Sequence, residues 1–410
     1  MKLLYFASHQ AWPVNSGARL RDHHLSRQLA VRCSVTFAEM RHAGEEWRTP
    51  PAHSGLGTIV TLDKGRTYSV SRIVRGLAGP VPVTVLNCWT RRSASELARV
   101  LRTSQFDSVQ IEGVHLMEYL PILRNAPGSP AIVVDWHNIE SEMMWRYAAT
   151  PVNGLKKLAA RRTANLIERA EDRLLRAQVL HTVTSERERQ KLAARNPLAN
   201  IQVIPNGVDA AYFARGAEPN PRAGRAGDSA KRTIVFVGSM DYHANIDAVA
   251  RFAREAWPVI ARQHPQLQFV IVGRDPAPAI RALASGRIRV TGTVADVRPF
   301  YDEAIAAVAP MHSGSGTRLK ILEAMAAGVP VVSTRLGAEG IDVENDVHIL
   351  LAESGPELVA AVDRVVTSTE TRERLAAAAR VFEVRRDRRL SSVVNFLPPR
   401  SSLLRHSRQC

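Results

Sequence analysis

Residues 312–334 of this 410-residue chain read HSGSGTRLKILEAMAAGVPVVST and combine a glycine-rich loop, a helix and a buried strand. The small residues of the loop can bring backbone N–H groups close to a ligand. The positive end of the following helix, which we expect to be about eleven residues long, favours an anion. Gly328 is expected to end the helix, and the apolar run after it predicts a strand. Such a unit is typical of a parallel α/β sheet that binds a phosphate.

Charged side chains distinguish this helix from an ordinary buried one. Lys320 and Glu323 are three residues apart and share one face, whereas the apolar residues between and around them form a stripe for packing on a sheet. A short glycine-rich loop alone also occurs in α/β proteins that bind no nucleotide. Together with Arg318, however, three charged groups on an otherwise apolar helix need solvent or a ligand. The stretch therefore predicts half of a nucleotide site.

The string GTRLKILEAMAAGVPVVST resembles the donor-binding signature of the large retaining glycosyltransferase group that includes the bacterial family 4 enzymes. Residues 203–213, VIPNGVDAAYF, resemble the segment that joins the two domains of such enzymes. Residues 236–249, FVGSMDYHANIDAV, resemble the start of their second domain. Residues 134–142, VDWHNIESE, resemble the strand-end segment that supplies a histidine, and residues 13–29 resemble the N-terminal glycine loop and its helix. The resemblance spans most of the chain up to about residue 375 and is stronger in its second half.

Apolar, β-rich runs alternate with helical patterns along the chain, which predicts parallel sheets. We therefore predict an α/β fold with two Rossmann-like, doubly wound domains facing across a cleft, the arrangement called GT-B. Residues 1–205 are expected to form the acceptor-side domain and residues 206–379 the domain that binds a nucleotide-sugar donor. Residues 380–410 show no sustained helical period and contain Pro398-Pro399. We therefore expect an atypical basic tail instead of the final helix of related enzymes, either a disordered segment or the product of an altered reading frame.

Composition bounds the class of protein independently. A length of 410 residues, 45% of them hydrophobic, suits a globular protein with two cores. Cys33, Cys88 and Cys410 lie far apart in no pattern of metal ligands or disulfides, which fits a reducing compartment. The N-terminal apolar stretch is too short for a signal peptide, and no apolar run approaches the roughly 18 residues needed to span a bilayer. We expect a cytoplasmic protein.

The net charge of +16 points to anionic partners. Part of it lies in residues 153–178, where leucines and alanines at helical spacing are surrounded by lysines and arginines. The solvated face of an ordinary helix accounts for this pattern. The alternative is peripheral contact with an anionic membrane on its inner face. Specific nucleic-acid binding is disfavoured, because no zinc, RNP or helix-turn-helix pattern occurs and aromatic residues make up only 6% of the chain.

The resemblance implies roles for the charged residues of the quoted stretch. Arg318 and Lys320 are expected to stabilise the leaving diphosphate, and Glu323 to accept hydrogen bonds from ribose hydroxyls. Ser239 and Ala244 stand where many relatives carry an arginine and a lysine for the phosphates, so phosphate binding should rest on Arg318 and Lys320. Ser315 replaces the first glutamate of the family motif, so contacts with the donor sugar should come from loop groups. The further donor-binding residues that we expect are Gly17, Gly238, Ser313, Gly314, Ser315, Gly316 and Thr317.

His137, at the end of a predicted strand, matches the histidine that contacts the donor sugar in relatives; a capping or core histidine is the alternative. Asp135 is expected either to polarise the acceptor hydroxyl or to orient His137. No spacing of paired carboxylates indicates double displacement, and the resemblance implies retention by front-face attack. No Asp-x-Asp triad occurs in the chain, so we expect neither a metal ion nor another cofactor.

The sequence therefore predicts a retaining, metal-independent glycosyltransferase. It should move a hexose from a UDP- or GDP-sugar to a glycan or a lipid-linked acceptor, in the synthesis of bacterial polysaccharide or envelope glycan. A nucleotide-sugar 2-epimerase of the same fold and a non-catalytic, basic nucleic-acid-binding protein are the alternatives from other classes. The pattern does not set donor base, sugar, acceptor, linkage or oligomeric state. The replacement at Ser315 and the unusual C-terminal residues leave activity itself to be tested.

Overall fold

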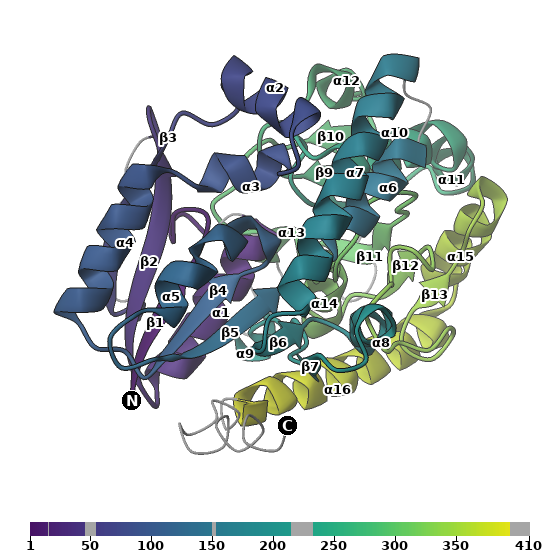
Figure 1. Cartoon of the computed structure of the whole chain (residues 1–410). Coiled ribbons are helices and arrows are strands. Elements are labelled where there is room, and N and C mark those ends of the chain that lie inside the picture. Colours follow the sequence, from purple (N-terminus) through teal and green to yellow (C-terminus); the bar gives the residue numbers. More distant parts are fainter. Residues whose placement is uncertain (15, 46–54, 150–152, 215–232, 394–410) are drawn as a thin grey trace. The chain divides into compact units, whose positions relative to one another are not determined.

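The computed structural model describes residues 1–14, 16–45, 55–149, 153–214 and 233–393, without the side chains of residues 384, 385 and 387–393 (Figure 1). The chain divides into two compact units between Pro205 and Asn206. Unit 1 is built on Met1–Pro205, and unit 2 comprises Asn206–Leu390. Each unit is described by itself.

Unit 1 contains a seven-stranded sheet in the order β3-β2-β1-β4-β5-β6-β7, and every pairing in it is parallel. The chain winds outward from β1 to one edge and then from β4 to the other, as in a doubly wound sheet. The strands confirm the runs predicted from the sequence; they are β1 (Lys2–Phe6), β2 (Ser34–His42), β3 (Thr58–Gly65), β4 (Ser108–Glu112), β5 (Ala131–Trp136), β6 (Leu180–Val183) and β7 (Asn200–Val203).

Five helices of unit 1 begin at a side chain that caps them. Ser16, Ser69, Thr90, Asn153 and Ser185 each accept a hydrogen bond from the backbone N–H three residues on. The helices are α1 (Gly17–Ala30), α2 (Val70–Ala78), α3 (Val83–Cys88), α4 (Arg91–Thr103), the 3₁₀ helix η2 (Val114–Tyr119), α5 (Leu120–Arg124), α6 (Glu140–Ala149), α7 (Gly154–Leu175) and α8 (Glu186–Arg195).

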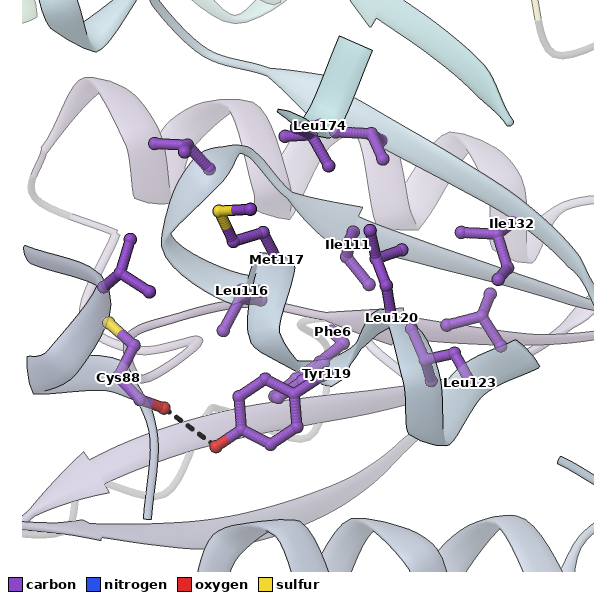
Figure 2. Packing of buried hydrophobic residues seen from close by; sticks show 14 of the residues in the cluster. Phe6, Cys88, Ile111, Leu116, Met117, Tyr119, Leu120, Leu123, Ile132 and Leu174 are labelled. Carbon is purple, nitrogen blue, oxygen red and sulfur yellow. Dashed lines mark hydrogen bonds between the residues drawn. The ribbon is translucent and has the colours of Figure 1, made fainter. Parts of the chain in front are cut away.

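The sheet of unit 1 is buried on both faces. Successive side chains of β1 point to opposite sides: Leu4 and Phe6 belong to one apolar cluster, and Leu3 and Tyr5 belong to another. Figure 2 shows part of the larger cluster, in which the Tyr119 hydroxyl donates to a backbone carbonyl at 2.8 Å. Because β1 is covered by apolar side chains on both faces, its polar neighbours can gather only beyond its carboxyl end.

Unit 2 repeats this plan with a six-stranded parallel sheet in the order β10-β9-β8-β11-β12-β13. Alternate residues of its central strand again enter two different apolar clusters. The strands are β8 (Thr233–Val237), β9 (Gln268–Val272), β10 (Ile288–Val290), β11 (Ala304–Ala309), β12 (Val331–Ser333) and β13 (Leu350–Leu351). The helices are α9 (Ala210–Ala214), α10 (His243–Glu255), α11 (Trp257–Gln263), α12 (Pro278–Arg281), α13 (Arg298–Asp302), α14 (Leu319–Ala326), α15 (Gly355–Thr367) and α16 (Thr369–Val393).

Helix α14 is shorter than the sequence predicts. It has eight residues instead of about eleven, because the loop before it stays non-helical up to Arg318. At its other end Gly328 adopts a φ of 71° and donates its N–H to Met325, which is how a glycine ends a helix. The prediction for Gly328 is therefore confirmed.

Helix α16 corrects the prediction that regular structure stops near Arg380, because it continues to Val393. Leu375, Ala379, Glu383 and Arg386 are all buried, so one helical face stays covered over three turns. Because Glu383 and Arg386 are charged, the helical period of this face is not visible in the pattern of hydrophobic residues. Residues 394–410 of the predicted tail lie outside the described residues. Among the helices in the described part of the chain, none combines the length and apolar character that crossing a bilayer requires.

Candidate functional site

Gly238, at the carboxyl end of β8, is the point in unit 2 where the predicted donor-binding residues meet. A Cβ atom at this position would lie 2.8 Å from the Lys320 ammonium and 2.8 Å from the side-chain amide nitrogen of Asn245. Lys320 Nζ donates to Asn245 Oδ1 at 2.7 Å and lies 3.9 Å from the centre of the Phe236 ring. The ammonium from α14 is thus held against the end of the central strand, where a side chain at residue 238 would displace Lys320 or Asn245.

Lys320 and Glu323 are both held in surroundings that weaken their charge. Burial lowers the pKa of Lys320 well below its ordinary range, and the nearby charge of Arg318 lowers it further. Burial raises the pKa of Glu323, although the Tyr301 hydroxyl donates to its Oε2 at 3.0 Å. A phosphate beside Lys320 and a hydroxyl donor beside Glu323 would each stabilise the charged form. This chemistry fits a nucleotide.

The loop before α14 is held by Arg318. Its guanidinium donates to the carbonyl oxygens of Ser313 at 3.3 Å, of Gly316 at 3.1 Å and of Ser315. Gly314 and Gly316 have φ angles of 90° and 80°, which residues with side chains rarely adopt. Arg318 therefore fixes the loop conformation, a contact that the sequence did not indicate for a residue expected to bind phosphate.

Two hydroxyl groups of this loop lie inside the structure. The Oγ atom of Ser315 and the Oγ1 atom of Thr317 are buried and have no hydrogen-bond partner in the described structure. Buried polar atoms are normally satisfied, so these hydroxyls are available to a polar ligand. Gly314 lies close to the first turn of α10, since a Cβ there would be 2.8 Å from the Tyr242 hydroxyl. The loop and α10 thus border the same place as Gly238.

In unit 1, two histidines and two carboxylates form a closed ring in which they alternate. His9 Nε2 lies 3.0 Å from Asp22 Oδ2, and His9 Nδ1 lies 3.4 Å from Glu112 Oε2. His137 Nε2 lies 3.1 Å from Asp22 Oδ1, and His137 Nδ1 lies 3.5 Å from Glu112 Oε1. We call these four residues the imidazole–carboxylate ring. They follow β1, end β4, follow β5 and lie on α1, so the fold gathers them at one edge of the sheet.

Asp135, the last but one residue of β5, ties this ring to Arg21. The Arg21 guanidinium makes two hydrogen bonds to the carboxylate, at 2.8 and 2.7 Å, and the Thr182 hydroxyl adds one at 2.6 Å. Asp135 Oδ2 also lies 3.2 Å from His137 Nε2. Because Asp135 is only 1% exposed, its position suits the expected role of orienting His137 and not direct contact with an acceptor.

The carboxylates hold both imidazoles in the protonated form. Burial alone would lower the pKa of His9, but Glu112 and Asp22 raise it from 6.5 to about 9. Burial would likewise lower the pKa of His137, but Asp22, Asp135 and Glu112 raise it well above its ordinary value. His137 is therefore a cation with both ring nitrogens directed at carboxylates.

The charges of this cluster balance when both imidazoles are protonated. Two imidazolium groups and Arg21 then face three carboxylates, and the pKa of each carboxyl group is lowered by these cations against the effect of burial. His9, Asp22 and Glu112, and likewise Asp22, Asp135 and His137, bring potential metal ligands within 4.8 Å of one another. Since protons already balance the carboxylates, the cluster needs no metal ion for neutrality.

The structure brings most predicted site residues together within their own units. Lys320, Glu323, Gly238 and the loop lie together in unit 2, and Asp135 and His137 do so in unit 1. Gly17 is the exposed first residue of α1, directly after its capping residue, and no contact assigns it a role. Sequence reasoning missed Asn245 and Tyr301, whose only signal was their position near predicted strand ends, and it missed the ring partners of His137.

Comparison with known proteins first defines the fold. Sucrose-phosphate synthase from Thermosynechococcus elongatus matches over 97% of this chain and 98% of its own, with a TM-score of 0.72 and 15% identity. HepE from Anabaena, solved in complex with UDP and glucose, matches over 96% of this chain and 99% of its own, with a TM-score of 0.61 and 14% identity. The chain has the GT-B glycosyltransferase fold.

Sequence comparison then gives the family. Residues 23–212 match the model of Glycosyltransferase Family 4, and residues 231–368 match that of the group 1 glycosyl transferases. A phosphatidyl-myo-inositol mannosyltransferase from Mycobacterium tuberculosis is 32% identical over 188 residues, which are 43% of this chain and 47% of that protein. The chain thus spans about half the length of the curated relatives it matches. It belongs to the group 1, family 4 glycosyltransferases.

Proposed function

We propose that this chain transfers a hexose from a UDP- or GDP-sugar to a glycan or lipid-linked acceptor, with retention of configuration. The observation that carries the proposal is the site at Gly238, where a half-buried lysine, a half-buried glutamate and a glycine-rich loop meet at the carboxyl end of a central parallel strand. Ligands of open α/β sheets bind at such strand ends. Glycosyl transfer is the reaction of the family, and the related mannosyltransferase supports a hexose as the transferred group.

In the proposed reaction, Lys320 stabilises the negative charge that grows on the diphosphate as the sugar leaves. Glu323 accepts hydrogen bonds from the ribose hydroxyls, because its carboxylate already lies beside the hydroxyl of Tyr301 and has further lone pairs. Arg318 keeps the loop in the conformation that presents its N–H groups to the donor. The bond between the anomeric carbon and the diphosphate breaks, and the acceptor oxygen forms a bond to that carbon on the face that the diphosphate leaves. The leaving phosphate takes the proton of the acceptor hydroxyl, and no metal ion takes part.

On the acceptor side, His137 is the candidate for contact with the reacting sugar. Its imidazolium is held by the ring carboxylates and by Asp135, and its side chain is 9% exposed. A hydroxyl oxygen of the sugar would accept from an N–H group of His137 in exchange for one of the present carboxylate contacts. His137→Gln should therefore lower the transfer rate while leaving the affinity for free nucleoside diphosphate unchanged.

We propose that helix α2, together with the basic helix predicted from the sequence, takes part in the membrane contact. Four apolar residues at the spacing of one helical face are exposed on it and form the α2 stripe: Val70, Ile73, Val74 and Leu77. Val70 and Val74 are 78% and 57% exposed. Such a continuous apolar face in water indicates a partner.

The first turn of α7 extends this surface. Leu155 and Leu158 are 83% and 67% exposed, whereas the rest of α7 packs into unit 1. The Arg162 guanidinium donates to the carbonyl oxygens at the end of α2, so the two helices are joined. Lys156 and Arg161 are exposed beside the leucines. Apolar residues bordered by cations suit an anionic bilayer surface, so we place the contact on the α2 stripe and the start of α7, at the inner face of the membrane.

The decisive experiment for the proposed function measures the melting temperature with UDP, GDP, ADP and dTDP, each with and without Mg²⁺. At a hundredfold excess over Kd, a ligand stabilises the folded state by about 2.7 kcal/mol, so the correct nucleotide should raise the melting temperature by about 5 °C or more. A selective shift that does not depend on Mg²⁺ supports the proposal. No shift with any nucleotide in folded protein would contradict it, and interconversion of a nucleotide sugar without acceptor would identify an epimerase instead.

A further inference from the structure

The backbones of β8 and β9 continue side by side beyond the ends of both strands. The N–H of Gly238 donates to the carbonyl of Val272 at 2.9 Å, and the N–H of Met240 donates to the carbonyl of Arg274 at 2.9 Å. A Cβ atom at Gly273 would lie 1.7 Å from the carbonyl oxygen of Gly238, so only glycine permits this approach. The close pairing places Arg274 opposite the residue that follows Gly238.

Arg274 lies against Ser239, and a chain of hydrogen bonds leads from Ser239 to the catalytic lysine. Arg274 Nε donates to Ser239 Oγ at 3.0 Å. The side-chain amide of Asn245 donates to the carbonyl oxygen of Ser239 at 2.9 Å, and its own oxygen accepts from Lys320 Nζ at 2.7 Å. Two cations from different elements, α14 and the end of β9, are thereby linked around the turn between β8 and α10.

The first turn of α10 adds a third favourable feature for an anion. This helix has 13 residues, its capping residue Tyr242 makes no side-chain cap hydrogen bond, and its first turn contains no acidic residue. Its positive end therefore lies beside the two cations without an opposing carboxylate in that turn. The loop at Gly314, whose φ is 90°, closes this place from another side.

Arg274 also contacts two aspartates, but both pairs lie at the surface. Arg274 Nη2 is 3.3 Å from Asp241 Oδ2, and Arg274 Nη1 is 3.1 Å from Asp275 Oδ2. The aspartate side chains are 46% and 64% exposed. Exposed ion pairs are weak, so a doubly charged ligand can displace one of them. With 30% of its side chain exposed, Arg274 is accessible from solvent as well as from Ser239.

We propose that Arg274 binds the diphosphate of the nucleotide donor together with Lys320, and that Ser239 and Asn245 hold the two cations in place. This inference rests on the proposed function, because it assumes that the site at Gly238 takes a nucleoside diphosphate. The phosphate contact is thereby assigned to Arg274, which follows β9 and lies outside the glycine-rich loop, α14 and β8.

The test is titration calorimetry with UDP and GDP on wild type, Arg274→Ala and Arg274→Gln. The glutamine variant keeps a donor for Ser239 and removes only the charge, so it remains informative if the alanine variant folds poorly. We expect both substitutions to weaken binding of the preferred diphosphate about tenfold or more, and to weaken binding of the corresponding monophosphate less. Arg251→Ala is the matched control, because Arg251 lies in the same unit in an exposed ion pair with Asp247 at 3.1 Å.

A rescue variant separates phosphate binding from a structural role. Ser239 is the point that Arg274 touches, so Ser239→Arg returns a guanidinium to the same place in the Arg274→Ala background. Recovery of at least half of the lost affinity, in logarithmic units, supports the inference; a structural role through the two aspartates would give no recovery. Unchanged diphosphate affinity in folded Arg274→Gln would overturn this inference alone. Failure of the wild type to bind either nucleotide would overturn the proposed function, and this inference with it.

Discussion

Lys320 and Glu323 lie half-buried near each other, and each is kept partly discharged by its surroundings. The only hydrogen-bond partner of the Lys320 ammonium among the described residues is an uncharged amide oxygen, and Glu323 accepts from an uncharged phenol. Burial works against both charges. A ligand with charges and hydroxyl groups stabilises the charged forms of both residues when it binds. Such a ligand therefore gains more binding free energy here than in a site whose ions are already paired. Two predictions concern these residues.

Binding of a nucleoside diphosphate should be accompanied by proton uptake at Lys320. Burial lowers the pKa of the free ammonium, and a neighbouring phosphate raises it again, so the lysine is more protonated in the complex than in the free protein. Affinity should therefore fall as pH rises through the interval between the two pKa values. Calorimetry at pH 8 in two buffers of different ionisation enthalpy measures the uptake directly. In Lys320→Arg the side chain is always charged, and the uptake should vanish; equal uptake in that variant would refute the assignment.

Glu323 should confer a preference for ribose over 2′-deoxyribose. A carboxylate accepts from both hydroxyls of a vicinal diol, so loss of one hydroxyl weakens binding. We expect Glu323→Gln to reduce this preference about tenfold, which corresponds to roughly 1.4 kcal/mol. The measurement compares Kd values for the preferred nucleoside diphosphate and its 2′-deoxy form. Tyr301→Phe removes the hydroxyl that donates to Glu323 and should give a smaller change; an undiminished preference in Glu323→Gln would exclude ribose contact.

At the scale of elements, the carboxyl ends of β1, β4 and β5 hold the imidazole–carboxylate ring, whose charge depends on pH. The imidazole pKa values are raised, so their contribution to stability is complete below pH 6.5. The contribution of His9 is lost as pH rises through about 9, and that of His137 is lost as pH rises through its own raised pKa. The carboxyl pKa values are lowered, so their contribution is complete above about pH 4.5 and is lost on acidification. Unit 1 should be most stable between these two ranges.

We accordingly expect the free energy of unfolding of unit 1 to fall between pH 6.5 and 9. For His9 alone the fall amounts to at most about 3 kcal/mol. Urea titrations at several pH values, followed by tryptophan fluorescence, measure it. His9→Gln should be less stable at pH 6 but should show a flatter pH dependence, and His312→Gln, an exposed histidine of unit 2, should match the wild type. If the free energy of unfolding of His9→Gln had the same pH dependence as that of the wild type, the ring would not be protonated as described.

The α2 stripe should determine binding to lipid. Val70→Ser with Val74→Ser removes two of its most exposed apolar side chains and should reduce binding to anionic vesicles about tenfold or more. Co-sedimentation with vesicles of phosphatidylglycerol and phosphatidylcholine measures this, and vesicles of phosphatidylcholine alone show the contribution of charge. Leu198→Ser is a matched control, because Leu198 is 94% exposed elsewhere in unit 1. Equal binding of the double variant and the wild type would remove the α2 stripe from the proposal.

At the scale of the whole molecule, helix α16 connects the last part of unit 2 to its first residues. Arg386 Nε donates to the carbonyl oxygen of Asn206 at 2.5 Å, and the buried carboxylate of Glu383 accepts from the N–H of Val208 at 3.4 Å. These contacts lie beyond Arg380, in a segment that the sequence led us to treat as a tail. They explain why the helix continues.

Arg386→Ala should destabilise unit 2 by about 1–3 kcal/mol, because it removes the charged donor from the half-buried carbonyl group of Asn206. Chemical unfolding followed by circular dichroism measures the change. Arg374→Ala lies on the same helix but removes a surface pair with Asp346, so its effect should stay below about 1 kcal/mol. Equal effects of the two substitutions would mean that the contact with Asn206 does not hold the helix.

The sequence was sufficient to predict the sheets, and it named most of the residues now proposed for the donor site, because both signals are local. The strands of both units are continuous apolar runs, and Lys320, Glu323 and Gly314 fall within one short stretch. The ring in unit 1 could not be predicted, because Asp22 and Glu112 reach His137 only after parallel pairing brings distant segments together. Asn245 and Arg274 were missed for the same reason: each meets its partner across the end of β8.

The contact between Asn206 and Arg386 also bears on how such a protein can be recombined from segments of other proteins. A segment whose first and last residues touch forms a closed module, and a module of this kind can be cut out, inserted into another chain or permuted with little disturbance at its boundary. Residues 206–386 meet this condition, and they contain every described residue of the site at Gly238. Under the proposed function, recombination of this module would exchange the nucleotide specificity in one step and leave unit 1 unchanged.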